Sequence, residues 1–192
     1  MEVKQLKKLF GSYTQFTKEC KEYQYGFGKG NRRGSGSILF PVNGADCHTA
    51  KWLELFDPKT EDLSWIAEVF PSLEILEISE NKYQKLNSLN GIENLKNLKS
   101  LILNSQVDIE KKISINKLGD SVEELYLWYT NIDFKILNPK MNFIYLHETQ
   151  VSNFENLKNI QCNYLKLYKL NDLDGNSLGV NDFSGEFNEF TL

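Results

Sequence analysis

Groups of three apolar residues recur along the chain with one spacing. In each group the second apolar residue lies three positions after the first, and the third lies two positions after the second. The clearest copy consists of Val122, Leu125 and Leu127, and the small polar residue Thr130 follows three positions later. Copies of this pattern begin at residues 50, 73, 98, 122, 141 and 162, so successive starts lie 23, 25, 24, 19 and 21 residues apart. This recurrence predicts a repeat array over residues 50–170.

Each copy predicts one short β-strand with a buried face. Side chains alternate between the two faces of a strand, so the second and third apolar residues of a copy point to the same side. The segments between the strands carry apolar residues of their own and vary in length. The 19-residue unit that starts at Val122 has little room for an α-helix, and its Asn138-Pro139 pair would interrupt one.

The segments before the array have different patterns. Residues 3–24 have apolar positions at steps of three and four, which predicts helix, and Gly11 allows either one long helix or two short ones. The glycine-rich segment 26–37 predicts a flexible or hairpin-like loop, and residues 37–42 predict a short strand in which Pro41 suits an edge position. We therefore expect a single structural domain with three parts: residues 1–49 as an N-terminal helical cap, glycine-rich loop and first strand, residues 50–170 as the repeats, and residues 171–192 as a C-terminal cap.

The units resemble leucine-rich repeats, whose consensus spacing is Leu-x-x-Leu-x-Leu-x-x-Asn/Cys-x-Leu at about 20–29 residues per repeat. Residues 91–104 and 149–159 are similar in particular to the bacterial, internalin-like type of repeat. The resemblance implies an α/β solenoid of about six units with a concave parallel β-sheet, an N-terminal helical cap and an irregular C-terminal cap.

One departure from the consensus concerns the asparagine that hydrogen-bonds the turn backbone in the family. It is present only as Asn81, and the other units carry Gln106, Thr130, Thr149 and Leu170 in its place. Gln and Thr side chains can still bond backbone groups nearby, whereas a leucine side chain cannot. The turn at Leu170 is therefore expected to be irregular.

The resemblance also implies which strand positions face the concave side, since these are the ones that the core does not use. Three such positions in each of six units make eighteen, and eight of them are aromatic, against about two expected from the 12% aromatic content. Six of the eight fall in the last three units. Neighbouring strands lie about 4.8 Å apart, so these side chains are predicted to form one contiguous patch.

This patch and its charged neighbours predict a site for a protein partner, because exposed aromatic clusters usually mark interfaces. An alternative is that residues 171–192 fold over the patch and bury it as ordinary core. The predicted partner-binding residues are Trp52, Glu54, Phe56, Glu77, Glu124, Tyr126, Trp128, Phe143, Tyr145, His147, Tyr164, Lys166 and Tyr168.

The charge distribution is uneven. Residues 1–49 carry eight Lys/Arg and four Asp/Glu, and the remainder carries fourteen and twenty-two, which gives +4 and −8 for a net charge of −4. An acidic array argues against a nucleic-acid partner and weakly favours a basic protein partner. The sequence contains neither a run of 18 apolar residues nor a signal-peptide pattern, so we expect a cytoplasmic protein without a membrane partner.

Candidate chemistry is sparse. The three cysteines, Cys20, Cys47 and Cys162, have irregular spacing, and no second cluster of metal ligands accompanies the Cys47-His48 pair. The glycine-rich segment lacks the Gly-Lys-Ser/Thr ending of a phosphate-binding loop. His147 could act as a general base only if a nucleophile or a second carboxylate lay close to it, and Glu124 and Lys166 are the only candidate neighbours. We therefore predict no metal, no cofactor and no catalytic residue.

The pattern favours a non-catalytic protein-binding module, such as an inhibitor, a toxin-immunity protein or an adaptor. One alternative is an enzyme that uses Cys20 or Cys47 as the nucleophile and the repeats as its substrate reader. Residues 1–49 are, however, short for an independent catalytic core. A second alternative is a glycan-binding repeat protein. The sequence leaves the oligomeric state open.

Overall fold

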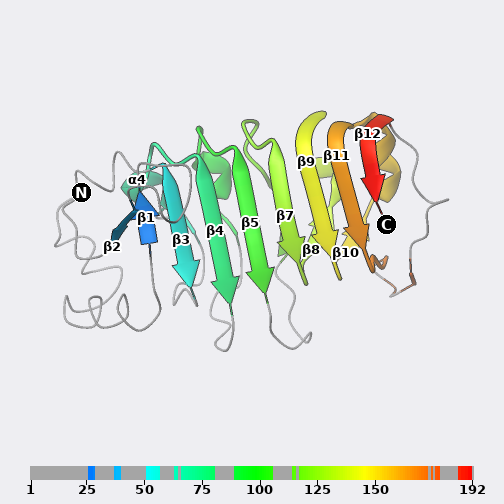
Figure 1. The fold of residues 1–192 in the computed structure, drawn as a ribbon, viewed down its shortest axis with the longest axis horizontal. Coiled ribbons are helices and arrows are strands. Elements are labelled where there is room, and N and C mark those ends of the chain that lie inside the picture. The colour runs from blue at the N-terminus through cyan, green and yellow to red at the C-terminus, as the bar shows by residue number, and fades with distance from the viewer. Residues whose placement is uncertain are drawn as a thin grey trace.

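The computed structural model describes residues 26–28, 37–39, 51–56, 63–64, 66–80, 89–105, 114–115, 117–172, 174, 176–177 and 186–191 of the chain. Its main element is an open sheet of nine strands in the order β12-β11-β9-β7-β5-β4-β3-β1-β2, which forms the row of arrows in Figure 1. The strands from β3 to β12 pair in parallel, and β1 pairs antiparallel with both β2 and β3. The described part of the chain thus has a mostly parallel sheet with few helices, an α/β-like arrangement without a closed barrel.

The strands of this sheet are β1 (Gly26–Gly28), β2 (Ser37–Leu39), β3 (Trp52–Phe56), β4 (Ile75–Glu80), β5 (Ser100–Ser105), β7 (Glu124–Trp128), β9 (Lys140–His147), β11 (Gln161–Tyr168) and β12 (Glu186–Thr191).

The strand register follows the apolar spacing of the sequence. One row of paired positions contains the second apolar residue of each copy: Leu53, Leu76, Leu101, Leu125, Ile144 and Leu165. The next row contains the third: Leu55, Ile78, Leu103, Leu127, Leu146 and Leu167. In β7 the side chains alternate as predicted, because Leu125 and Leu127 are buried while the residues on either side of them are partly exposed.

A second layer lies behind this sheet in Figure 1 and consists of short elements. It contains the parallel strands β6 (Ser114–Ile115), β8 (Asn131–Asp133) and β10 (Gln150–Ser152) and the helical turns α4 (Ile66–Val69), η1 (Ile92–Asn94), η2 (Phe134–Ile136) and η3 (Phe154–Asn159). Ile132, Phe134 and Val151 from this layer belong to the same buried cluster as Leu125. The core therefore lies between the large sheet and the short elements. Within the described residues, the unit that starts at Val122 has a 3₁₀ turn where a longer unit could hold an α-helix.

The same tight turn follows three successive strands. Tyr129, Glu148 and Lys169 come directly after β7, β9 and β11 and have φ angles of 54°, 49° and 50°, in the left-handed region. Backbone hydrogen bonds connect the turns, since Glu148 N donates to Tyr168 O (2.8 Å) and Asn171 N donates to Thr149 O (3.2 Å). The expected irregularity at Leu170 is wrong, because these bonds between backbone groups form the turn without help from its side chain.

Two threonines occupy the consensus asparagine position in these turns, and both are buried. Thr149 Oγ1 donates to His147 O at 3.2 Å and lies 3.5 Å from Leu127 O, as expected for a threonine that replaces the asparagine. Thr130 Oγ1 is buried without a hydrogen-bond partner in the described part of the chain. Equivalent residues thus differ in whether the hydroxyl group is satisfied.

We expect the same substitution to have different effects on stability at the two threonines. Thr149→Val removes a hydrogen bond and should lower the free energy of unfolding by about 1 kcal/mol. Thr130→Val replaces an unpaired buried hydroxyl with a methyl group, so it should leave stability unchanged or raise it by up to about 1 kcal/mol. Urea denaturation followed by far-UV circular dichroism compares the two variants, and equal losses would contradict the assignment.

The N-terminal expectations have mixed outcomes. The helix predicted over residues 3–24 lies outside the described residues. The strand predicted over 37–42 is present as β2, Ser37–Leu39, at one edge of the sheet. The sequence did not predict β1, Gly26–Gly28, which pairs antiparallel with β2 and fits the hairpin interpretation of the glycine-rich segment.

The irregular C-terminal cap is wrong for residues 186–191, which form the regular strand β12. Phe187 and Phe190 pair with Cys162 and Leu165 of β11. The sequence did contain a signal, because Phe187, Phe190 and Leu192 repeat the apolar spacing 25 residues after Cys162. Since β12 extends the sheet sideways, residues 186–191 do not cover its face. Among the described residues, no helix is long and apolar enough to span a membrane.

Candidate functional site

Strands β7, β9 and β11 place their aromatic side chains on the free face, by which we mean the side of the large sheet turned away from the core. Strand pairing aligns Tyr126 with Tyr145 and Trp128 with His147. It also aligns Phe143 with Tyr164 and His147 with Tyr168. We call this group the aromatic surface; its members are Tyr126, Trp128, Phe143, Tyr145, His147, Tyr164 and Tyr168.

The rings of the aromatic surface contact one another in two rows that cross the strands. In the first row Tyr126 stacks on Phe143, with 4.7 Å between ring centroids and 18° between ring planes, and Phe143 lies 6.2 Å from Tyr164. Such offset stacking stabilises aromatic pairs by about 0.5–1.5 kcal/mol beyond the area they bury. The first row is therefore a pre-arranged group of rings.

The second row runs from Trp128 to Tyr168. The Trp128 and Tyr145 rings meet edge-on, with 5.0 Å between their centroids, and the centroids of Tyr145 and His147 are 6.3 Å apart. The His147 ring stacks on the Tyr168 ring, with 4.6 Å between centroids and 15° between ring planes. The Tyr129 ring approaches the same imidazole edge-on, with 5.8 Å between centroids. The predicted contiguity of these side chains therefore agrees with their contacts in the structure.

Exposure differs across the free face. Tyr164 and Tyr168 are 44% and 45% exposed, and the other members of the aromatic surface are partly buried. Ser100 and Ile102, on the free-face positions of β5, are buried. The accessible rings thus belong to β7, β9 and β11.

Trp52 requires a correction. Its side chain is only 1% exposed, so it is not available to a partner, and its Nε1 has no hydrogen-bond partner in the described part of the chain. Strand alternation predicted the face on which Trp52 lies, but it could not predict whether other parts of the protein cover that position. Glu54 and Phe56 lie in β3, paired with Glu77 and Ser79 of β4, and their side chains lie outside what the structure describes.

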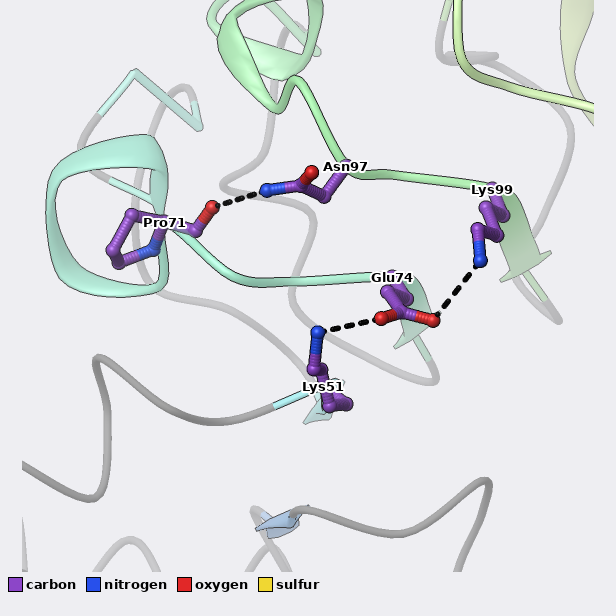
Figure 2. A network of polar contacts seen from close by, with 5 residues as sticks. All are labelled: Lys51, Pro71, Glu74, Asn97 and Lys99. Atoms are coloured by element: carbon purple, nitrogen blue, oxygen red, sulfur yellow. Dashed lines mark hydrogen bonds and ion pairs between the residues drawn. The ribbon is translucent and has the colours of Figure 1, made fainter.

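An ion-pair ladder lies where the early strands begin, away from the aromatic surface. Figure 2 shows Glu74 between Lys51 and Lys99, with Nζ–O distances of 2.6 Å and 3.3 Å. Asn97 Nδ2 donates to Pro71 O at 3.1 Å in the same region. The hydrogen bond from Lys51 and the positive charge of both lysines lower the pKa of the Glu74 carboxyl below its usual value. The carboxylate of Glu74 is thus compensated within the chain, and one positive charge of the two lysines remains.

Another ion pair lies at the other end of the strands. Lys169 Nζ is 3.2 Å from Glu148 Oε1 and lies over the Tyr168 ring, 5.2 Å from its centroid. The carboxylate raises the pKa of Lys169 above its usual value. Sequence reasoning missed Tyr129, Glu148 and Lys169 as neighbours of the aromatic surface, because no sequence signal marks a left-handed conformation at these residue types.

Two described side chains with potential chemistry, Cys162 and His147, have constrained surroundings. Cys162 is buried, which raises the pKa of its thiol, and its Sγ lies 3.2 Å from Tyr164 O. The contacts of His147 are with aromatic rings, and its Nδ1 is buried without a hydrogen-bond partner among the described residues. No cluster of three potential metal ligands occurs in the part of the chain that the structure describes. Cys20, Cys47 and His48 lie outside that part.

Comparisons with protein-family models, with curated proteins and with solved structures found no match to this chain.

Proposed function

We propose that the chain is a leucine-rich-repeat solenoid of about six units and that its aromatic surface docks a protein partner without catalysis. One observation carries the proposal: three adjacent strands present two rows of mutually contacting, partly exposed rings on a face that the core does not use. Large rings that are already held by one another lose little conformational entropy when a partner covers them. The surface is therefore pre-organised for binding.

The size of the aromatic surface supports a protein partner. A fully buried Phe, Tyr or Trp contributes about 150–250 Å², and a standard interface buries about 800 Å² on each side. The seven rings, of which Tyr164 and Tyr168 are nearly half exposed, would supply part of such an area, and their polar neighbours would supply the rest. Tyrosine and tryptophan are also the residues most enriched among those that dominate binding energy.

The arrangement of the rings favours a protein over a glycan. A sugar needs an open ring face on which its C–H groups can stack. In the Tyr126–Phe143 and His147–Tyr168 pairs, however, one face of each ring is turned toward its neighbour. Ring edges, hydroxyl groups and the imidazole remain for contact, and these suit the mixed apolar and polar surface of a protein. In biological terms we propose a cytoplasmic inhibitor, toxin-immunity protein or adaptor.

The test combines Tyr126→Ala with Trp128→Ala. The tagged wild-type protein captures partners from a lysate, mass spectrometry identifies them, and the affinity of a purified partner is then measured for each variant. Loss of two dominant contacts should weaken binding by more than about 100-fold.

The matched control is Lys135→Ala with Glu155→Ala, which changes two exposed residues of η2 and η3 on the other side of the core. It should bind as the wild type does, and circular dichroism should show that both double variants are folded. A partner that binds all three proteins equally would show that the aromatic surface is not the docking site.

A further inference from the structure

Three charged side chains on the free face form no ion pair with any described residue. They are Glu77 of β4, Glu124 of β7 and Lys166 of β11, and each is partly buried. By contrast, Glu74 and Glu148 at the ends of the strands are paired with lysines. Covering an unpaired charge removes it from water, which is unfavourable unless the covering group brings the opposite charge.

Lys166 lies within the aromatic surface. It is two residues from both Tyr164 and Tyr168 on the same face of β11, and it pairs with Tyr145 of β9. A partner that covers these rings therefore lies next to Lys166, within reach of its ammonium group. A carboxylate is the protein group that satisfies it best.

Glu124 lies at the border of the aromatic surface, paired with Phe143. Its Oε1 accepts a hydrogen bond from Asn142 Nδ2 at 3.2 Å, and Asn142 Oδ1 accepts one from Asn163 Nδ2 at 3.0 Å. The two amides orient the carboxylate, and no described residue donates to its other oxygen. This oxygen is available to a guanidinium or ammonium group.

The two charges have a definite separation. Glu124 and Lys166 are two strands apart, about 10 Å across the sheet, and two residues apart along the strands, about 7 Å. The diagonal is about 12 Å, which an extended peptide spans in three or four residues. A partner could therefore satisfy both charges with one short segment.

We propose that the aromatic surface receives a protein segment that presents a carboxylate to Lys166 and a guanidinium or ammonium group to Glu124, about 12 Å apart, with apolar side chains between them. This inference rests on the proposed function and specifies its partner. The acidic net charge of the array led us to expect a basic partner. The docking segment is instead bipolar, with one acidic and one basic group.

The probe is a displayed library of random twelve-residue peptides, selected on the wild-type protein and counter-selected on Tyr126→Ala with Trp128→Ala. Enriched peptides should carry an acidic and a basic residue three or four positions apart. Lys166→Glu should weaken a selected peptide by about 10- to 100-fold, and Glu124→Lys should do the same. Exchanging the matching peptide residue for one of opposite charge should restore binding to each variant.

The controls separate this inference from the proposed function. Lys135→Glu, at an exposed site in η2, should leave the selected motif unchanged. Lys166→Met and Glu124→Gln repeat the test without charge reversal if a reversed variant fails to fold. Enriched peptides that need Tyr126 and Trp128 but show no charge preference would overturn the bipolar segment and leave the docking surface in place. If no enriched peptide depends on those two rings, both proposals fail.

Discussion

Replacing Leu125 with alanine is expected to lower the free energy of unfolding by about 3 kcal/mol. The side chain is fully buried in β7, in the middle of the large sheet, where it pairs with Leu101 on one side and Ile144 on the other. Removing three carbon atoms leaves a cavity that neighbours on fixed strands cannot fill, so the loss exceeds the transfer free energy of the atoms themselves.

Urea denaturation followed by far-UV circular dichroism measures the effect of Leu125→Ala. The matched control is Glu123→Ala, two positions earlier, where the side chain is exposed and the change should stay within about 0.5 kcal/mol. A loss below about 1 kcal/mol for Leu125→Ala would show that the core at this strand is loosely packed.

Gly91→Ala is expected to destabilise the protein by more than about 3 kcal/mol or to prevent folding. Gly91 has a φ of 100°, which residues other than glycine rarely adopt. A residue with a side chain that is forced into this conformation is strained by about 1–3 kcal/mol. An added Cβ would also collide with the backbone of the preceding link: with Ser64 Cα, with Ser64 N at 2.6 Å and with the Leu63 carbonyl carbon at 2.9 Å. Backbone atoms cannot rotate away as a flexible side chain can, so strain and clash act together.

Gly119→Ala is the matched control for this position. Its φ is not in the left-handed region, and a Cβ there would have its nearest neighbour, Leu95 O, at 3.6 Å, an ordinary van der Waals contact. We expect a change within about 1 kcal/mol for this variant. Thermal and urea unfolding of both proteins check the difference, and similar stabilities for the two variants would contradict the close approach of residues 63–64 to Gly91.

The apolar spacing predicted the strands well because strand geometry is local. A side-chain period of two and a repeat period of about 19–25 residues determine which residues of each copy share a face, and similar copies stack with their equivalent positions in register. Leu76, Leu101 and Leu125 therefore align as predicted. The free-face positions of β7, β9 and β11 follow from the same rule.

The turns and the strand at the end of the chain were harder to predict. The left-handed conformations of Tyr129, Glu148 and Lys169 depend on backbone hydrogen bonds to the neighbouring turn, which are long-range contacts. The strand β12 carries the repeat spacing at Phe187 and Phe190, but whether this spacing forms a strand depends on pairing with β11, which is also a long-range contact. Local propensity was therefore a poor guide at both places.

The pattern of apolar residues was enough to assign side chains to the core or to the opposite face, because alternation along a strand requires no knowledge of the rest of the protein. By contrast, the folded arrangement of the chain sets which free-face residues are accessible and which are paired. It buried Trp52, joined Tyr126 to Phe143 and His147 to Tyr168, and left Glu124 and Lys166 without an ion pair among the described residues. The reason is physical: burial and charge pairing depend on neighbours that are distant in sequence, and repeat spacing carries no information about them.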